Sequence, residues 1–186
     1  MVAGTYPPRI RCYDLHDLTM KFERYVDGHI TDLVMLGEDY GKMAILQDDR
    51  TIAFHAHYGK HESIRIPKFG RGMAYEPTTC ELIIASSCND VYRLNLEEGR
   101  FMQPWSINAP PGVATSCISV SQVQPLASVG CDDGIVRFFD SRAPDEQLKP
   151  FLKLNVQAAT GGYGYADTSR FHHQNIHEII SVVHDP

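Results

Sequence analysis

The stretch LASVGCDDGIVRFFD (Leu126–Asp140) is the clearest indication of the fold in this 186-residue chain. It has the form of a strand, a polar turn and a second strand. Valine, isoleucine and phenylalanine fit the pleated, half-buried surface of a sheet, and aspartate and glycine accept the positive φ angles of a tight turn. The stretch therefore predicts a β-hairpin with a buried face.

The same hairpin pattern occurs three more times along the chain. It returns as AILQDDRTIAF (Ala44–Phe54), as LIIASSCNDVYRL (Leu82–Leu94) and, in its second half, as IRCYD (Ile10–Asp14). Aligning the copies gives spacings of 42, 39 and 45 between the equivalent residues Ile10, Ile52, Val91 and Val136. A period of about 40–45 residues with four short strands per unit is typical of WD-type β-propellers. A β-sandwich would also space its strands evenly, but it does not account for the repetition.

The repeats predict an all-β chain of about four to four and a half propeller blades. We expect a partial blade in 1–27, whole blades in 29–68, 70–107 and 113–155, a loop insertion in 156–175 and the first strand of the next blade in 176–186. The last strand could close onto the partial first blade and complete a small four-bladed ring. Because Met1 lies so close to the first strands, the sequence favours a fragment of a larger ring.

Composition narrows the class of protein. The chain is 43% hydrophobic and carries a formal charge of -6, which suits a folded domain and argues against a general polyanion binder. No apolar run approaches the roughly 20 residues of a membrane helix, and no signal peptide is visible. Five cysteines without disulfide spacing suit a reducing compartment, with Cys12, Cys80 and Cys117 as small packing residues.

Several separated motifs resemble one family. They are GTYPPRIRCYD (4–14), KFER (21–24), RIPKFGR (65–71) and VYRLNLEEGRF (91–101). In this order they are similar to the nucleolar protein ten family, also called essential nuclear protein two, whose members are WD-repeat ribosome-biogenesis factors. The resemblance covers about residues 1–155.

The resemblance implies a seven-bladed ring and a place in the nucleolar small-subunit processome, which processes pre-ribosomal RNA. It implies a non-catalytic scaffold whose partners are other processome proteins, with pre-ribosomal or small nucleolar RNA as a second class. No cofactor, membrane or small-molecule substrate is expected. A generic WD-repeat adaptor acting elsewhere in the cell and a β-propeller enzyme remain as alternatives.

A basic stretch stands out against the acidic average. Lys60, Arg65, Lys68 and Arg71 lie within twelve residues around Phe69. We predict that Arg65, Lys68, Phe69 and Arg71 form an exposed loop that docks on an acidic partner segment or an RNA phosphate. The alternative is that Phe69 packs between blades and the cations are ordinary surface residues.

Other candidate groups have simpler interpretations. Asp14 and Asp140 follow strands at equivalent positions and are expected to make turn hydrogen bonds, and Glu97–Arg100 is expected to be a hairpin turn. His55 and His57 share a strand face and are expected at the surface. His172, His173 and His177 do not form a zinc motif and are expected in a solvated loop. No nucleophile or phosphate-loop motif is present, so the sequence favours a non-enzyme without catalytic, metal or cofactor-binding residues.

Overall fold

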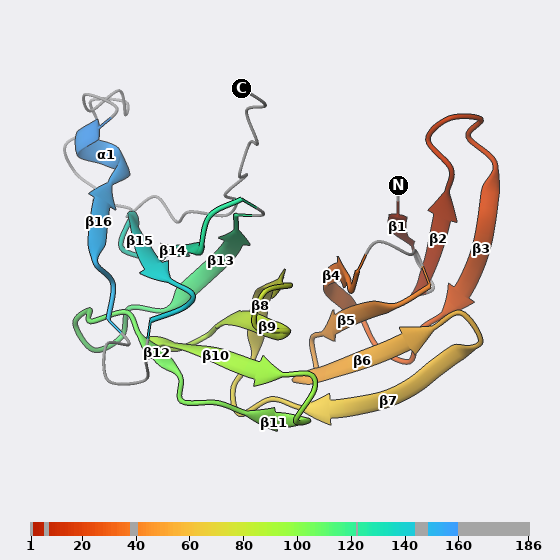
Figure 1. The fold of residues 1–186 in the computed structure, drawn as a ribbon, viewed down its shortest axis with the longest axis horizontal. Coiled ribbons are helices and arrows are strands. Elements are labelled where there is room, and N and C mark those ends of the chain that lie inside the picture. The colour runs from red at the N-terminus through yellow and green to blue at the C-terminus, as the bar shows by residue number, and fades with distance from the viewer. Residues whose placement is uncertain (1, 6–7, 38–40, 122, 144–148, 160–186) are drawn as a thin grey trace, which may run out of the picture. The chain divides into compact units, whose positions relative to one another are not determined.

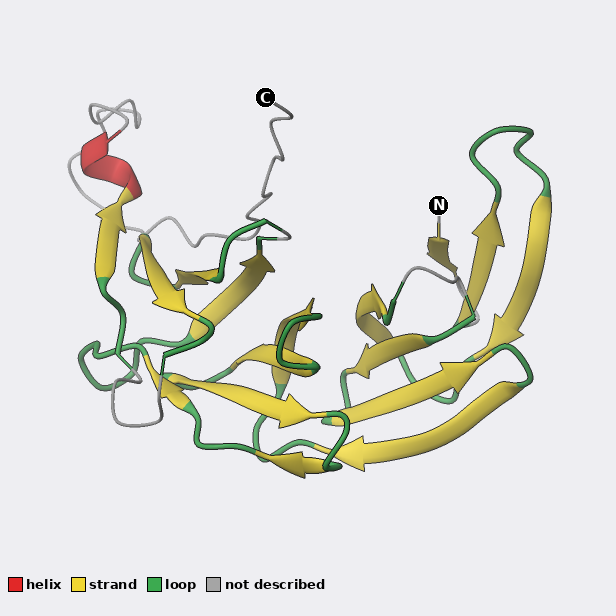
Figure 2. Cartoon of the chain, in the orientation of Figure 1, coloured by secondary structure: helices red, strands yellow, loops and turns green. Residues whose placement is uncertain are grey.

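The computed structural model of the protein describes residues 2–5, 8–37, 41–121, 123–143 and 149–159. These residues form sixteen β-strands and one four-residue helix (Figures 1 and 2). Within them, no helix has the length and apolar character needed to cross a bilayer. The predicted all-β class is confirmed. The chain divides into two compact units, Met1–Phe69 and Gly70–Pro186.

The first unit contains two antiparallel sheets, each a simple meander. The first sheet has the order β1 (Val2–Thr5), β2 (Arg9–Tyr13), β3 (Met20–Tyr25). The second has the order β4 (Ile30–Met35), β5 (Met43–Gln47), β6 (Thr51–Ala56), β7 (Gly59–Arg65). All five residues of β5 are buried, as expected for a central strand covered on both faces. Ile10 of the first sheet and Val26, which directly follows β3, share a buried cluster with Met43, Ile45 and Ala53 of the second sheet.

The second unit repeats this arrangement. One sheet contains β8 (Gly70–Glu76), β9 (Glu81–Ser86), β10 (Asp90–Asn95), β11 (Arg100–Phe101) and β12 (Trp105–Ser106). The other contains β13 (Thr115–Val120), β14 (Leu126–Cys131), β15 (Ile135–Asp140) and β16 (Leu152–Asn155). Successive strands pair antiparallel within each sheet, as in propeller blades.

The residues that the sequence repeats equate occupy equivalent places in the four sheets. Ile10, Ile52, Val91 and Val136 are each the second residue of their strand, and all four are buried. The preceding turn also shows why the repeat tolerates substitution. Gly134 has a φ of 72° and Arg50, its counterpart, has a φ of 68°. The turn thus requires the left-handed conformation but accepts an arginine at some cost in strain.

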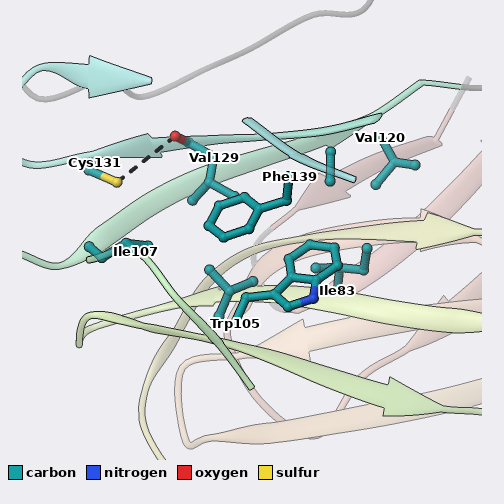
Figure 3. Close-up of a cluster of buried hydrophobic side chains, with 9 residues drawn as sticks. Ile83, Trp105, Ile107, Val120, Val129, Cys131 and Phe139 are labelled. Carbon is teal, nitrogen blue, oxygen red and sulfur yellow. Dashed lines mark hydrogen bonds between the residues drawn. The ribbon is translucent and has the colours of Figure 1, made fainter. Parts of the chain in front are cut away.

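The core of the second unit is built around a pair of aromatic rings. Trp105 and Phe139 stack with ring centroids 5.0 Å apart and an interplanar angle of 7°, and each is 1% exposed (Figure 3). The same buried cluster includes Val91 of one sheet, Val129 and Cys131 of the other, and Ile107, which directly follows β12. The two sheets are also joined at Thr115, whose hydroxyl accepts a hydrogen bond from the Ser86 amide at 2.6 Å and donates to the Ser86 carbonyl at 2.9 Å.

The segment expected as a loop insertion begins differently. Residues Val156–Ala159 form one helical turn, α1, directly after β16. Asn155 stabilises it, because the Asn155 side-chain oxygen accepts a hydrogen bond from the Ala158 amide at 3.0 Å. The rest of that segment, 160–175, and the predicted strand in 176–186 lie outside the described residues.

Candidate protein-interaction surface

Three of the four predicted docking residues belong to the first unit. Arg65 ends β7, and Lys68 and Phe69 lie in the loop that follows. All three side chains are exposed, and Phe69 keeps 55% of its surface accessible. An exposed aromatic side chain close to two cations is typical of protein-binding surfaces.

Arg50 joins these residues in the structure. Its guanidinium lies over the Phe69 ring at 5.6 Å and donates a hydrogen bond to the Pro67 carbonyl at 3.2 Å. Arg50 is fifteen residues from Arg65, and sequence reasoning missed it. The signal that could have found it is strand pairing, because Thr51 lies opposite Arg65 in the ladder between β6 and β7. We call Arg50, Arg65, Lys68 and Phe69 the basic loop.

The fourth predicted residue has a different environment. Arg71 is the second residue of β8 in the second unit, and its guanidinium pairs with the Asp132 carboxylate at 2.8 Å. Lys60, the other cation of the stretch, pairs with Asp27 at 2.7 Å. These two charges are therefore balanced within the chain, whereas Arg65 and Lys68 of the basic loop are exposed.

The expected turn residues are confirmed. The Asp14 carboxylate accepts a hydrogen bond from the His16 amide at 2.8 Å, and the Asp140 carboxylate accepts one from the Arg142 amide at 2.9 Å. Glu97–Arg100 is a hairpin turn between β10 and β11, with Gly99 at a φ of 64°. These carboxylates therefore shape turns.

Two ion pairs with buried arginine side chains lie in the second unit. Arg93 on β10 donates two hydrogen bonds to the Glu81 carboxylate on β9, at 2.8 and 3.0 Å, and both side chains are about 95% buried. Arg137 pairs with Asp133 in the same two-pronged way, at 2.9 and 2.6 Å. The matched planar groups of Arg93 and Glu81 fix β10 relative to β9, whereas the Arg137–Asp133 pair fixes the turn that precedes β15.

The Cys131 thiol is unsuited to nucleophilic chemistry. All five cysteines are free, and Cys12, Cys117 and Cys131 are buried. Burial raises the pKa of the Cys131 thiol to about 11, although Arg137 lies beside it. A thiol with this pKa stays protonated near neutral pH, and the thiolate is the reactive form. The packing role expected for Cys12, Cys80 and Cys117 agrees with their buried or half-buried positions.

The surface position expected for His55 is wrong. His57 lies in the exposed turn after β6, but His55 is only 5% exposed, because its side chain points from β6 toward the first sheet of the unit. Alternation along a strand shows which residues share a face, but it does not show what covers that face.

Among the described residues, no group of three metal-ligating side chains occurs. His172, His173 and His177 lie outside the described residues.

His55 makes the fold sensitive to acid. Burial lowers the pKa of its imidazole below the ordinary value of 6.5, and the charges of Arg24 and Lys60 lower it further. The unfolded chain takes up this proton near pH 6.5 while the folded chain does not, so stability should fall as pH drops below about 6.5. We expect the urea midpoint of the unaltered chain to fall between pH 7.5 and pH 5. In His55→Leu the part of this fall that His55 causes should be absent. The variant His57→Leu, which retains His55, should keep the original pH profile.

Comparison with known proteins places the chain in a family. The family model described as Nucleolar protein 10-like, N-terminal domain, a β-propeller, matches residues 1–186. Ribosome biogenesis protein ENP2 of Saccharomyces cerevisiae is 37% identical over 156 residues, covering 84% of this chain and 22% of that protein. Nucleolar protein 10 of Xenopus tropicalis is 41% identical over 145 residues, covering 76% of this chain and 20% of that protein.

A solved structure shares the fold. Chaetomium thermophilum Raptor superposes with a TM-score of 0.68 at 16% identity, covering 81% of this chain and 15% of that chain. The chain spans about a fifth of the length of ENP2 and of Nucleolar protein 10. The names of these two relatives, a ribosome biogenesis protein and a nucleolar protein, confirm the nucleolar location that the motifs imply. The chain belongs to the Nucleolar protein 10 family, and its sheets are blades of that family's N-terminal β-propeller.

Proposed function

We propose that this chain is a non-catalytic scaffold segment that acts in ribosome biogenesis, as part of the small-subunit processome. The observation that carries the proposal is its 37–41% identity to relatives named for ribosome biogenesis and for the nucleolus. In this role the blades hold partner proteins in position for pre-ribosomal RNA processing. RNA itself is a second class of partner.

Two ion pairs of the second unit support a scaffold role. Arg93 pairs with Glu81 on the neighbouring strand, and Arg137 pairs with Asp133 in the turn before its own strand. A general acid or base must instead keep its proton-transferring atom open to a substrate. Groups fixed in this way stabilise rigid sheets, and rigid sheets are what a scaffold needs to present its loops.

The basic loop is the surface that we propose for partner binding. It combines an open aromatic ring with the cations Arg50, Arg65 and Lys68, and such surfaces suit acidic protein segments. Arg71 plays a smaller part in this proposal than the sequence suggested, because Asp132 already neutralises it. The formal charge of -6 favours protein over RNA as the main partner of this segment.

Charge reversal at the basic loop should weaken assembly. We expect Arg65→Glu with Lys68→Glu in the tagged full-length protein to reduce recovery of processome proteins at least about tenfold, because like charges then face the acidic partner. The measurement is quantitative mass spectrometry of the purified complexes. Lys42→Glu is the matched control, since Lys42 is an exposed lysine of the same unit.

Equal recovery in both variants would contradict the role of the basic loop. The salt dependence of recovery separates the partner classes. Binding to RNA phosphates releases counterions and weakens steeply as salt concentration rises, whereas a protein contact anchored by Phe69 should weaken less. Purified complexes without processome components would contradict the wider proposal.

A further inference from the structure

His55 has buried polar atoms that the described fold leaves without a hydrogen-bond partner. Its side chain is 95% buried in β6, and neither Nδ1 nor Nε2 has a protein partner. A buried polar group normally gains a partner, because leaving it bare costs about 1–3 kcal/mol. An imidazole held open in this way is suited to a ligand that supplies the missing hydrogen bond.

A pocket of about 290 Å³ lies against this imidazole. It is formed within the first unit between the end of β3 and strands β5, β6 and β7. Its lining includes Arg24, Asp27, Gln47, His55 and Lys60. The pocket therefore combines a buried hydrogen-bonding group with two cations and with the carboxylates of Asp27 and Glu23.

The charges around the pocket favour an anion. Lys60 is 42% exposed at the rim, and Arg24 donates its hydrogen bonds to the neutral carbonyl oxygens of Ala56 and His57. Glu23 also lines the pocket, but its carboxylate pairs with Arg9 and Arg11. Asp27 is the acid that opposes the cations, and its side chain is 78% exposed.

We propose that this pocket receives the carboxylate of a glutamate or aspartate from an acidic segment of a partner protein. The carboxylate accepts a hydrogen bond from the His55 ring and pairs with Lys60. The pocket is slightly smaller than the roughly 300–1,000 Å³ of small-molecule sites, which suits one inserted side chain. A side chain projects from its backbone and can reach the buried imidazole, whereas an RNA phosphate is part of the backbone itself.

Asp27 acts as an internal competitor in this arrangement. It holds the Lys60 ammonium at 2.7 Å, the position that an incoming carboxylate would take. Binding must therefore displace Asp27 toward solvent, where it is already mostly exposed. This contact limits affinity for weak anions and favours partners that present several acidic residues.

Binding is also coupled to the protonation of His55. In the unoccupied pocket, burial, Arg24 and Lys60 lower the pKa of His55, while Asp27 raises it. An inserted carboxylate stabilises the imidazolium and raises this pKa. Proton uptake on binding makes the affinity higher at pH 6.0 than at pH 7.5.

The test is fluorescence anisotropy with the full-length protein and a fluorescein-labelled hexaglutamate peptide, at pH 6.0 and 7.5 and constant ionic strength. Hexaglutamine and a six-nucleotide oligouridylate are the comparison probes. We expect Lys60→Met to weaken hexaglutamate binding about two- to fivefold and Asp27→Asn to strengthen it by a similar factor. Lys42→Met, at another exposed lysine of the unit, should leave the affinity unchanged, and His55→Asn should remove the pH dependence.

Several results would overturn the proposal. Equal effects of Lys60→Met and Lys42→Met would place the peptide elsewhere, and so would an Asp27→Asn variant that binds no more tightly. Oligouridylate binding that responds to the same substitutions would assign the pocket to RNA. Asp27 is exposed and its substitution does not depend on refolding of the core, so this arm stays informative even if His55→Asn is unstable.

Discussion

Replacement of Trp105 by alanine is expected to destabilise the second unit by about 3–5 kcal/mol, the usual range for removing a buried aromatic side chain. Trp105 is the only tryptophan in the chain. It is 1% exposed, stacks on Phe139 from the neighbouring sheet and carries the Arg93 guanidinium over its ring at 5.3 Å. Its loss therefore removes the packing between two sheets and leaves a cavity.

The unfolding free energy from urea or guanidinium titration measures this effect. Phe151→Ala is the matched control, because Phe151 is an aromatic residue of the same unit that is 64% exposed. Its substitution should change stability by less than about 0.5 kcal/mol. If the two variants were equally stable, the Trp105–Phe139 contact would not be the centre of this core.

Substitution of Glu81 by glutamine should cost about 3–5 kcal/mol, because it leaves the Arg93 charge buried without its carboxylate. The side chains of Arg93 and Glu81 are 6% and 5% exposed, so water cannot replace the lost partner. Thermal unfolding and denaturant titration of the variant measure the loss.

Two further variants separate a buried charge from a general defect. Glu98→Gln breaks the exposed pair with Arg100 and should change stability by no more than about 1 kcal/mol. The double replacement Glu81→Leu with Arg93→Met removes both charges and should recover much of the lost stability. A double variant as unstable as Glu81→Gln would mean that the hydrogen bonds, rather than the unpaired charge, dominate.

The strand pattern could be predicted because it is local. The equivalent residues Ile10, Ile52, Val91 and Val136 are apolar, and in the structure each is the buried second residue of its strand. A strand alternates its side chains every two residues, so the apolar face is readable from the sequence. The turns were readable for the same reason, since Asp140 and Gly99 act on their immediate neighbours.

The candidate surface could be predicted only in part. The basic stretch could be recognised in the sequence because Arg65, Lys68 and Phe69 lie within five residues of one another. The structure shows that all three are exposed. Arg50 lies beside Phe69 because β6 pairs with β7. Arg71 is instead neutralised by the Asp132 carboxylate, which is sixty-one residues away in the sequence. Charges can be counted in a sequence, but their partners depend on which strands lie side by side.

The all-β class, the repeat of about forty residues and the family motifs could be predicted from the amino-acid sequence, because each depends on residue type and spacing along the chain. Tertiary packing was needed to show that His55 is buried beside a pocket, that Trp105 stacks on Phe139 and that Glu81 neutralises Arg93. A sheet face is buried or exposed according to what packs on it. The packing element comes from another part of the chain, so folding has to bring the two together before the environment of these residues exists.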